Sequence, residues 1–500
     1  MENRQQFASR YGFIMAAVGS AVGLGNIWRF PAVAYENGGG AFLIPYLIAL
    51  LTAGIPLLIL EFTMGHKYRG SAPLSYFRMN KGSEWLGWWQ VLIAFVISTY
   101  YAVIIAWALS YTVFSFDLKW GDKPDAFLLG EYLKVADPGV FGSLVPGVLI
   151  PLAIVWVVTI GVLFKGVAKG IEKLNKIFLP LLFIMFTLIV IRAVTLDGAA
   201  EGLNAFFEPR WDLLTSGKVW VAAYGQIFFS LSIAFAIMIT YSSYLPKKSD
   251  INNNAFITGF ANSGFELLAG IGVFAALGFM AQQQGVPVDQ VVKSGIGLAF
   301  MVFPSIINSF PGLNELFGVL FFLSLVFAGM TSLISIVEVY VAALQDKFNI
   351  SRSKAVLGGG LVSALFSLIY ASNGGLNFLD IVDHFINTYG IVLSGLVEVV
   401  LIGWVFKKLG EFQNHANGLS DLRTGSWWVF CLKFVTPVLL GYMMIQLVIT
   451  ELKEPYANYP VEALIKYGAV TAAAIIILGI LLSFVKWDDK KTTTDHKEAM

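Results

Sequence analysis

Residues 19–26 read Gly19-Ser20-Ala21-Val22-Gly23-Leu24-Gly25-Asn26, in the middle of an apolar run from about 11 to 35. Glycine destabilises a helix interior by about 1 kcal/mol relative to alanine, so three glycines favour unwinding here. Unwound carbonyls within a membrane are tolerated only where protein buries them or where they line a cavity, and with an Asn oxygen they suit a small hard cation. Alternatively, Gly19 and Gly23 form a GxxxG packing contact, and this segment alone leaves both interpretations open.

The composition places the whole chain in a bilayer. Of its 500 residues, 57% are hydrophobic and 13% are charged, whereas soluble domains carry about 25% charged residues. The net charge of +1 gives no indication of a nucleic-acid partner, and a single cysteine, Cys431, excludes an intrachain disulfide. The N-terminus lacks the pattern of a cleaved signal peptide, so we expect it to be retained.

The apolar runs are long enough for helices to cross a membrane, and they predict an all-α polytopic protein with one transmembrane domain over residues 1–500. The expected twelve spans lie near 11–35, 41–65, 87–114, 144–164, 174–194, 217–244, 254–282, 313–344, 354–371, 377–406, 426–449 and 462–485. Lys and Arg cluster before the first span, after the last and in alternate loops. The positive-inside rule therefore predicts that both termini are cytoplasmic.

A second polar interruption occurs in the sixth span, at Phe229-Ser230-Leu231-Ser232-Ile233-Ala234-Phe235. Spans one and six are five apart, and an odd offset gives them opposite orientations, as in inverted repeats with a site at their interface. The predicted repeats are residues 11–194 and 217–406, followed by two further helices in 426–485. Further mid-membrane polar residues are Asn262, Glu266, Thr331 and Ser332. Glu266 is the most informative, because a buried carboxylate is costly and seldom lacks a role.

These residues carry a resemblance to a known family. The string from Gly19 to Asn26 continues as Ile27-Trp28-Arg29-Phe30-Pro31 and then Glu36-Asn37-Gly38-Gly39-Gly40, and it resembles the first-helix signature of neurotransmitter:sodium symporters. Supporting matches are Ile55-Pro56 with Glu61, Tyr100-Tyr101, Gln226 to Phe235, and Phe327-Ala328-Gly329-Met330-Thr331-Ser332. The resemblance implies a LeuT-like fold, a 5+5 inverted repeat with discontinuous helices 1 and 6.

The resemblance also implies two Na⁺ sites, all of whose protein ligands are neutral oxygens. The first would use the Ala21 carbonyl and the side chains of Asn26, Ser230 and Asn262, completed by the carboxylate of the substrate. The second would use the carbonyls of Gly19, Val22 and Ala328 and the hydroxyls of Thr331 and Ser332.

For the substrate, the resemblance implies that the amides of Leu24 and Gly25 and the hydroxyl of Tyr101 bind a carboxylate. The remaining contacts would come from Ala21, Phe229 and Ser232 to the amine, and from Ile97, Phe235, Ile336 and Ser332 around an apolar side chain. Monoamine carriers of the family have an aspartate at the position of Gly23, so glycine there favours a neutral amino acid. Ala234, where many relatives have glycine, favours a small or mid-sized aliphatic one.

The family comparison further implies two gates. Arg29 and Asp383 would close the outer side with Tyr101 and Phe229, and Arg4 and Asp346 would form a cytoplasmic latch with Tyr244. Without the resemblance, these charges would be interpreted as solvated helix ends, and Arg4 as positive-inside bias. Gly170 and Pro180 have the spacing at which relatives unwind helix 5; otherwise they mark a helix start and a kink.

Glu266 stands where chloride-dependent relatives have a serine, so a fixed carboxylate is expected to replace chloride. If Glu266 is protonated on the empty return step, the cycle exchanges Na⁺ for H⁺.

The predicted function is Na⁺-coupled, chloride-independent symport of a neutral hydrophobic amino acid into the cell across the plasma membrane. The alternative is a non-transporting amino-acid sensor of the same fold. An intramembrane enzyme is disfavoured, because the four histidines form no H-E-x-x-H or similar motif. No N-x-S/T sequon lies in a predicted outer loop, which favours a bacterial source over a eukaryotic glycoprotein.

Overall fold

The computed structural model describes residues 5–488, and within this range the chain forms helices and no β-strand. Ten continuous helical segments are long and apolar enough to cross a membrane. They are Gly40–Tyr68 (including α4, Leu43–Ala49, and α5, Ile55–Tyr68), Lys81–Phe114 (α7, Glu84–Phe114), Pro146–Phe164 (α9), Val167–Val194 (α10, Lys173–Val194), Ile251–Gln284 (α14), Asn314–Phe348 (α17), Arg352–Tyr370 (α18), Gly375–Val405 (α19, Gly375–Phe385, and α20, Val392–Val400), Ser426–Asn458 (α23, Thr436–Lys453) and Val461–Ser483 (α25, Val470–Ser483).

Two further segments are broken helices, and together they complete the twelve that the sequence predicts. The first consists of α1 (Arg10–Ala21) followed by α2 (Leu24–Trp28) and α3 (Phe30–Glu36), with a bend of 54° between the two halves. The second consists of α12 (Gly217–Ser230) and α13 (Ile237–Ser242), separated by residues 231–236. Both breaks fall at the polar interruptions, so the predicted all-α fold with discontinuous helices 1 and 6 is confirmed.

The first break is held by its own residues and by a neighbouring ring. Val22 and Gly23 leave the helical conformation, with ψ values of 91° and −165°. The Asn26 side chain accepts a hydrogen bond from the Gly23 amide at 2.8 Å and so caps the outer half. The close approach favours glycine at Gly25, because a Cβ there would lie 2.4 Å from the ring of Phe229, near the end of α12.

The second break stores backbone strain. Ser232, Ala234 and Ala236 have φ values of 55°, 66° and 70°, in the left-handed region that non-glycine residues adopt at a cost of about 1 to 2 kcal/mol each. Hydrogen bonds with two other helices oppose this cost. The Ala234 amide donates to Glu61 of α5 at 2.6 Å, and Ser394 of α20 donates to the Ala234 carbonyl at 2.6 Å.

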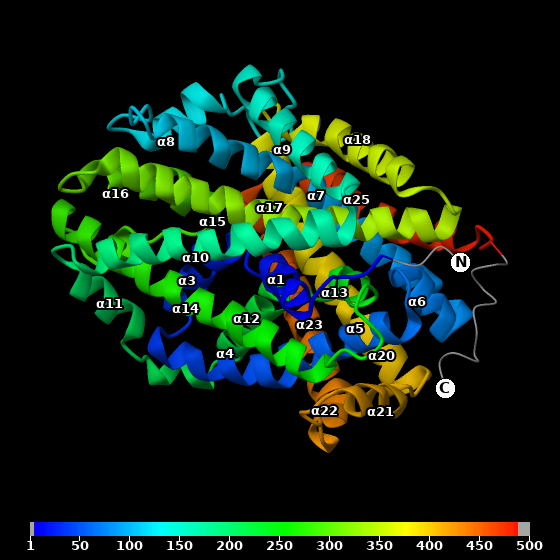
Figure 1. The fold of residues 1–500 in the computed structure, drawn as a ribbon. Coiled ribbons are helices and arrows are strands. Elements are labelled where there is room, and N and C mark those ends of the chain that lie inside the picture. Colours follow the sequence, from blue (N-terminus) through cyan, green and yellow to red (C-terminus); the bar gives the residue numbers. More distant parts are fainter. Residues whose placement is uncertain (1–4, 489–500) are drawn as a thin grey trace.

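The broken helices lie at the centre of the bundle, where α1 packs against α10, α14 and α17 (Figure 1). In the apolar windows of α7 and α17, 78% of the residues are buried, but only 17% are buried in the segment containing α23. The polar breaks are therefore shielded from lipid, whereas the last two helices present most of their surface to it.

Short helices lie in the connections. Between residues 283 and 312, where glycine and proline interrupt apolar pieces too short to span a membrane, the chain forms the short helices Val288–Gln290, Gly295–Gly297, Leu298–Val302 and α16 (Phe303–Ser309). Three other helices in the connections were not predicted from the sequence: α6 (Ala72–Met79), α11 (Ala199–Phe207) and α21 (Leu409–Leu419). α11 and α16 lie at the end of the bundle opposite α6 (Figure 1).

The strain in the second break gives the first prediction. Ala236→Gly removes a Cβ from a left-handed residue and should stabilise the protein by about 1 kcal/mol, reduced by the greater chain entropy of glycine. The melting temperature of the detergent-purified protein should rise accordingly. Ala222→Gly, the same change inside helix α12, is the control and should lower it. Equal destabilisation by both changes would show that residue 236 carries no strain.

Candidate functional site

Three polar side chains of the first predicted Na⁺ site meet beside the first break. Asn26 of α2 donates to Asn262 Oδ1 of α14 at 2.8 Å, and Asn262 Nδ2 donates to Ser230 Oγ of α12 at 3.0 Å. All three are buried. Ala21, whose carbonyl would complete the set, is the last residue of α1 and is also buried. The Asn26 side chain therefore links the Gly23 amide, which donates to its oxygen, to the Asn262 oxygen, which accepts from its amide nitrogen, although α2 and α14 are far apart in sequence.

The second predicted set gathers on the opposite side of the same break. Ser332 Oγ of α17 lies 3.2 Å from the Ser20 carbonyl and 3.5 Å from that of Gly19. Thr331 Oγ1 donates to the Ala328 carbonyl of its own helix at 3.0 Å. Val22, whose carbonyl is the remaining predicted ligand, is the capping residue that follows α1. Every oxygen here is neutral, which fits a monovalent cation that has to be released again.

Two of the residues predicted to bind substrate, Tyr101 and Ser232, contact the chain on either side of the first break. The Leu24 amide donates to the Tyr101 hydroxyl at 3.3 Å, and the Ser232 hydroxyl donates to the Ser20 carbonyl at 2.9 Å. The predicted apolar lining comes from three helical segments and is buried: Ile97, Phe235 and Ile336. A Cβ on Gly23 would lie 3.0 Å from the hydroxyl oxygens of both Tyr101 and Ser332.

On the outer side, Arg29 and Phe229 are in contact. The Arg29 guanidinium lies 4.3 Å from the centre of the Phe229 ring, a cation–π arrangement. Asp383 of α19 accepts a hydrogen bond from Asn387 at 2.7 Å and forms no direct ion pair with Arg29. Of the predicted outer gate, the structure therefore shows the contact between Arg29 and Phe229.

On the inner side, Arg4 lies outside the described residues. Asp346 of α17 accepts a hydrogen bond from the Ser71 amide at 2.8 Å. The Tyr244 hydroxyl donates to Glu338 at 2.6 Å, and Arg352 forms an ion pair with the same carboxylate at 2.6 Å. The sequence did not predict a role for Glu338 and Arg352 beside Tyr244. A glutamate within an apolar span could have indicated one, because a buried carboxylate needs a partner.

Glu266 is fully buried on α14, one helical turn beyond Asn262. Gln226 of α12 donates to its Oε1 at 2.6 Å, and the Tyr46 hydroxyl of α4 donates to its Oε2. Neither partner was predicted to act here; only the tertiary fold brings α4 and α12 to this carboxylate.

The predicted unwinding segment of helix 5 is helical here, but it begins with a π-helical turn at Val167–Glu172 that contains Gly170. A Cβ on Gly170 would lie 2.1 Å from the Val162 carbonyl, so the close approach of α9 requires glycine. Pro180 lies inside α10.

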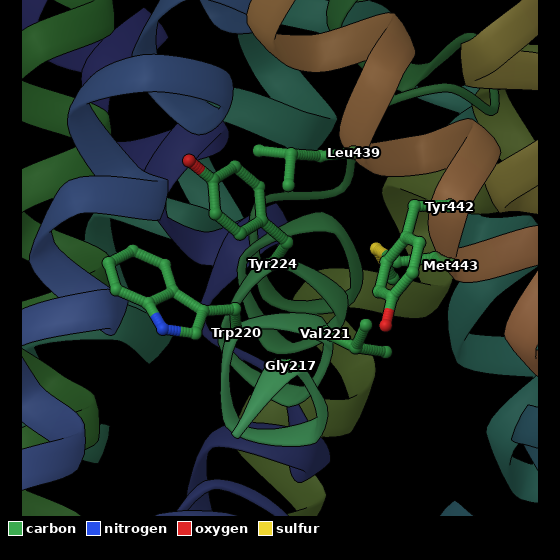
Figure 2. A pocket seen from close by; sticks show the side chains of 7 residues that line it. All are labelled: Gly217, Trp220, Val221, Tyr224, Leu439, Tyr442 and Met443. Atoms are coloured by element: carbon green, nitrogen blue, oxygen red, sulfur yellow. The ribbon is translucent and has the colours of Figure 1, made fainter. Parts of the chain in front are cut away.

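A separate cavity of about 170 Å³ lies between α12 and α23. Tyr442 and Met443 of α23 face Val221 of α12 across it (Figure 2). None of its lining residues belongs to the predicted sites.

Comparison with known proteins places the chain in a family. The sequence model of the sodium:neurotransmitter symporter family matches residues 4–131 and 126–487. The chain belongs to this family. Its members are transporters, so the chain is a sodium-dependent transporter rather than an enzyme.

Three relatives illustrate the range of this family. An uncharacterized sodium-dependent transporter of Methanocaldococcus jannaschii, MJ1319, is 41% identical over 485 residues, covering 97% of this chain and 98% of its own. The human sodium- and chloride-dependent GABA transporter 2 is 30% identical over 474 residues, covering 87% and 78% respectively. The crystal structure of MhsT in complex with L-phenylalanine matches with a TM-score of 0.75 and 34% identity, covering 89% of this chain and 99% of that one.

The second oxygen set gives a prediction that needs no substrate. Thr331→Val keeps the shape of the side chain but removes one oxygen. An oxygen that binds a charged group contributes about 1.5 to 3 kcal/mol, so the Na⁺ concentration for half-maximal thermal stabilisation should rise roughly tenfold to a hundredfold. Thr112→Val is the control, because the Thr112 hydroxyl bonds only to Ala108 of its own helix. If both variants needed the same Na⁺ concentration for half-maximal thermal stabilisation, Thr331 would not be a ligand of this site.

Proposed function

We propose that this protein is a secondary transporter that uses an inward Na⁺ gradient to carry a neutral hydrophobic amino acid into the cell by alternating access. The observation that carries the proposal is the pair of neutral oxygen sets on either side of the first break, one around Asn26 and one around Ser332. Between them, Gly23 adds no charge. A carboxylate of the substrate is the negative group that completes the first set.

The lining supports an apolar amino acid. Ile97, Phe235 and Ile336 offer no charge and no hydrogen-bonding group to the side chain of a substrate. MhsT, which has the same fold, was crystallised with L-phenylalanine. Ala234, where many relatives have glycine, directly precedes Phe235 of this lining and favours a small or mid-sized aliphatic substrate. Cotransport of two Na⁺ with a zwitterion moves two charges, worth about 4.6 kcal/mol at 100 mV, which supports roughly a thousandfold accumulation.

Chloride independence is the second part of the proposal. Glu266 receives hydrogen bonds from Gln226 and Tyr46 and lies one turn from Asn262, so its carboxylate provides the negative charge that an anion would otherwise bring. Protonation of Glu266 on the empty return step would add H⁺ export to the cycle.

The remaining assignments complete the transport cycle. We place the protein in the cell membrane with both termini in the cytoplasm, and we assign residues 11–194 and 217–406 to the two inverted repeats. In this scheme, Arg29 and Asp383 close the outer side over Phe229, while Asp346 and Tyr244 act with Arg4 on the inner side. The π-helical turn at Gly170, followed by Pro180, is where helix 5 opens toward the second Na⁺ set.

The test of this function is uptake by purified protein in liposomes with an inward Na⁺ gradient. Uptake of a neutral amino acid should require Na⁺ and continue when gluconate replaces chloride. Glu266→Ser should make uptake depend on chloride, because the lost charge has to be replaced. Glu266→Gln, which removes the charge but leaves no room for an anion, should be inactive with or without chloride. Chloride-dependent uptake by the unmodified protein would contradict the assignment.

Gly23 provides a sharper test of the substrate class. The first Na⁺ needs the ligand's carboxylate, and removing the partner of a buried charge costs about 2 to 5 kcal/mol, or about thirtyfold to several thousandfold in affinity. Leucine, alanine or methionine should therefore compete for binding at saturating Na⁺, while the matching amines should not. Gly23→Asp should abolish amino-acid binding by placing two carboxylates together.

The control is Gly23→Asn, which has almost the same size and no charge, and it should bind amino acids better than Gly23→Asp. Equal competition by amine and amino acid in the unmodified protein would rule out a carboxylate-completed site.

A further inference from the structure

Two buried carboxyl groups beside the second break belong to neither proposed Na⁺ site. Glu61 of α5 and Glu398 of α20 are both fully buried. Glu61 Oε1 accepts from the Ala234 amide at 2.6 Å, and Glu398 Oε2 accepts from Gln90 Nε2 at 2.9 Å. The other oxygen of each carboxyl group has no hydrogen-bond partner, and neither has the side-chain oxygen of Gln90.

The two helices that carry these carboxyl groups, α5 and α20, both contact one residue of the break. Glu61 binds the amide of Ala234, while Ser394, one helical turn before Glu398 on α20, donates to the carbonyl of Ala234 at 2.6 Å. The charge of Glu398 acts directly on Glu61. The three oxygens without partners are all buried and belong to α5, α7 and α20, and Gln90 joins α7 to Glu398 by a hydrogen bond.

No cation faces this region among residues 5–488. The groups that contact the two carboxyls are the Ala234 amide, the Gln90 amide and the Tyr76 hydroxyl of α6, all neutral at physiological pH. No Lys, Arg or His forms a hydrogen bond or ion pair with either carboxyl there. Two buried carboxylates without a partner are untenable, because each costs several kcal/mol in lost hydration and they repel one another.

We propose that Glu61 and Glu398 together form a binding site for one proton, with Glu61 protonated on Oε2, Glu398 ionised and one water between them. The water accepts the Glu61 O–H and donates its two hydrogens to Glu398 Oε1 and Gln90 Oε1. One proton and one water thus satisfy all three oxygens that lack partners, and the pair keeps a single negative charge.

The proton fixes the shape of the second break. Ala234 lies between Ser232 and Phe235, which the proposed function assigns to the substrate site, so this consequence rests on that function. A second negative charge beside Ala234 would push α5 and α20 apart and release the strained loop. This site is distinct from Glu266, whose partners are Gln226 and Tyr46.

The first test detects the proton directly and needs no transport. Infrared spectra of the purified protein at neutral pH should show the carbonyl stretch of a buried protonated carboxyl group. Glu61→Gln and Glu398→Gln should each remove that band, since one carboxylate and one amide need no proton. Glu266→Gln is the control and should leave it in place. Persistence of the full band in both single variants would overturn the proposal, as would its absence from the unmodified protein.

The second test separates a protonated Glu61 from an ionised one. Glu61→Gln keeps an acceptor for Ala234 and supplies an N–H in place of the O–H, so Na⁺-dependent amino-acid binding should stay within about threefold of the unmodified protein. Glu61→Ala removes both contacts and should weaken binding about tenfold or more. If Glu61→Gln is as impaired as Glu61→Ala, the native group is an ionised carboxylate and the proposal fails. If the unmodified protein binds no amino acid, the proposed function fails, while the infrared result still decides the proton site.

Discussion

The structure depends on one constraint: a polypeptide that leaves the helical conformation inside a membrane needs partners for every backbone group it frees. Helices 1 and 6 are interrupted at the same depth in the bundle, and each interruption helps to satisfy the other. Phe229, at the end of α12, packs against Gly25, at the start of α2, and Ser232 of the second break donates to the carbonyl of Ser20. The remaining groups are held by side chains from surrounding helices. The polar centre is therefore a consequence of unwinding. Its carbonyl and side-chain oxygens are also groups that could replace the water molecules around a cation.

Charge is distributed sparingly around this centre. The oxygens beside Asn26 and Ser332 are neutral, and the ionisable groups Glu61, Glu266 and Glu398 stand behind them without direct contact to a Lys or Arg. A fixed negative charge in direct contact would hold a monovalent cation too tightly to release it. Carboxyl groups that do not touch the cation can instead affect its affinity, because they accept hydrogen bonds from the backbone and side-chain amides around the site. In the proposed cycle, the same separation would let Glu266 take the place of an anion without adding a ligand to the first proposed Na⁺ set.

The strained residues of the second break indicate a segment that can change shape. Ser232, Ala234 and Ala236 occupy left-handed conformations that alanine and serine adopt reluctantly, and tight hydrogen bonds to both ends of the Ala234 residue keep them there. Strain held in place by the surrounding helices is a common feature of sites that have to change shape. A segment of this kind can move between two arrangements when its partners shift, because its local conformation has no deep minimum of its own.

The sequence by itself determined the membrane class, the number of crossings and the positions of both breaks. Hydrophobic runs and glycines are local signals: three glycines between Gly19 and Gly25 lower the local preference for helix, and a matching polar interruption five spans later favours unwinding over packing. The motif also identified the family and the residues from Ala21 to Asn262 that the structure brings together. Only the tertiary structure decided which distant groups complete these positions: Tyr46 and Gln226 on Glu266, Glu338 with Arg352 under Tyr244, and Glu398 with Gln90 beside Glu61. Those contacts join helices separated by up to several hundred residues, and their partners are single polar residues within apolar runs. No local pattern specifies such a pairing, because it is set by how the helices pack.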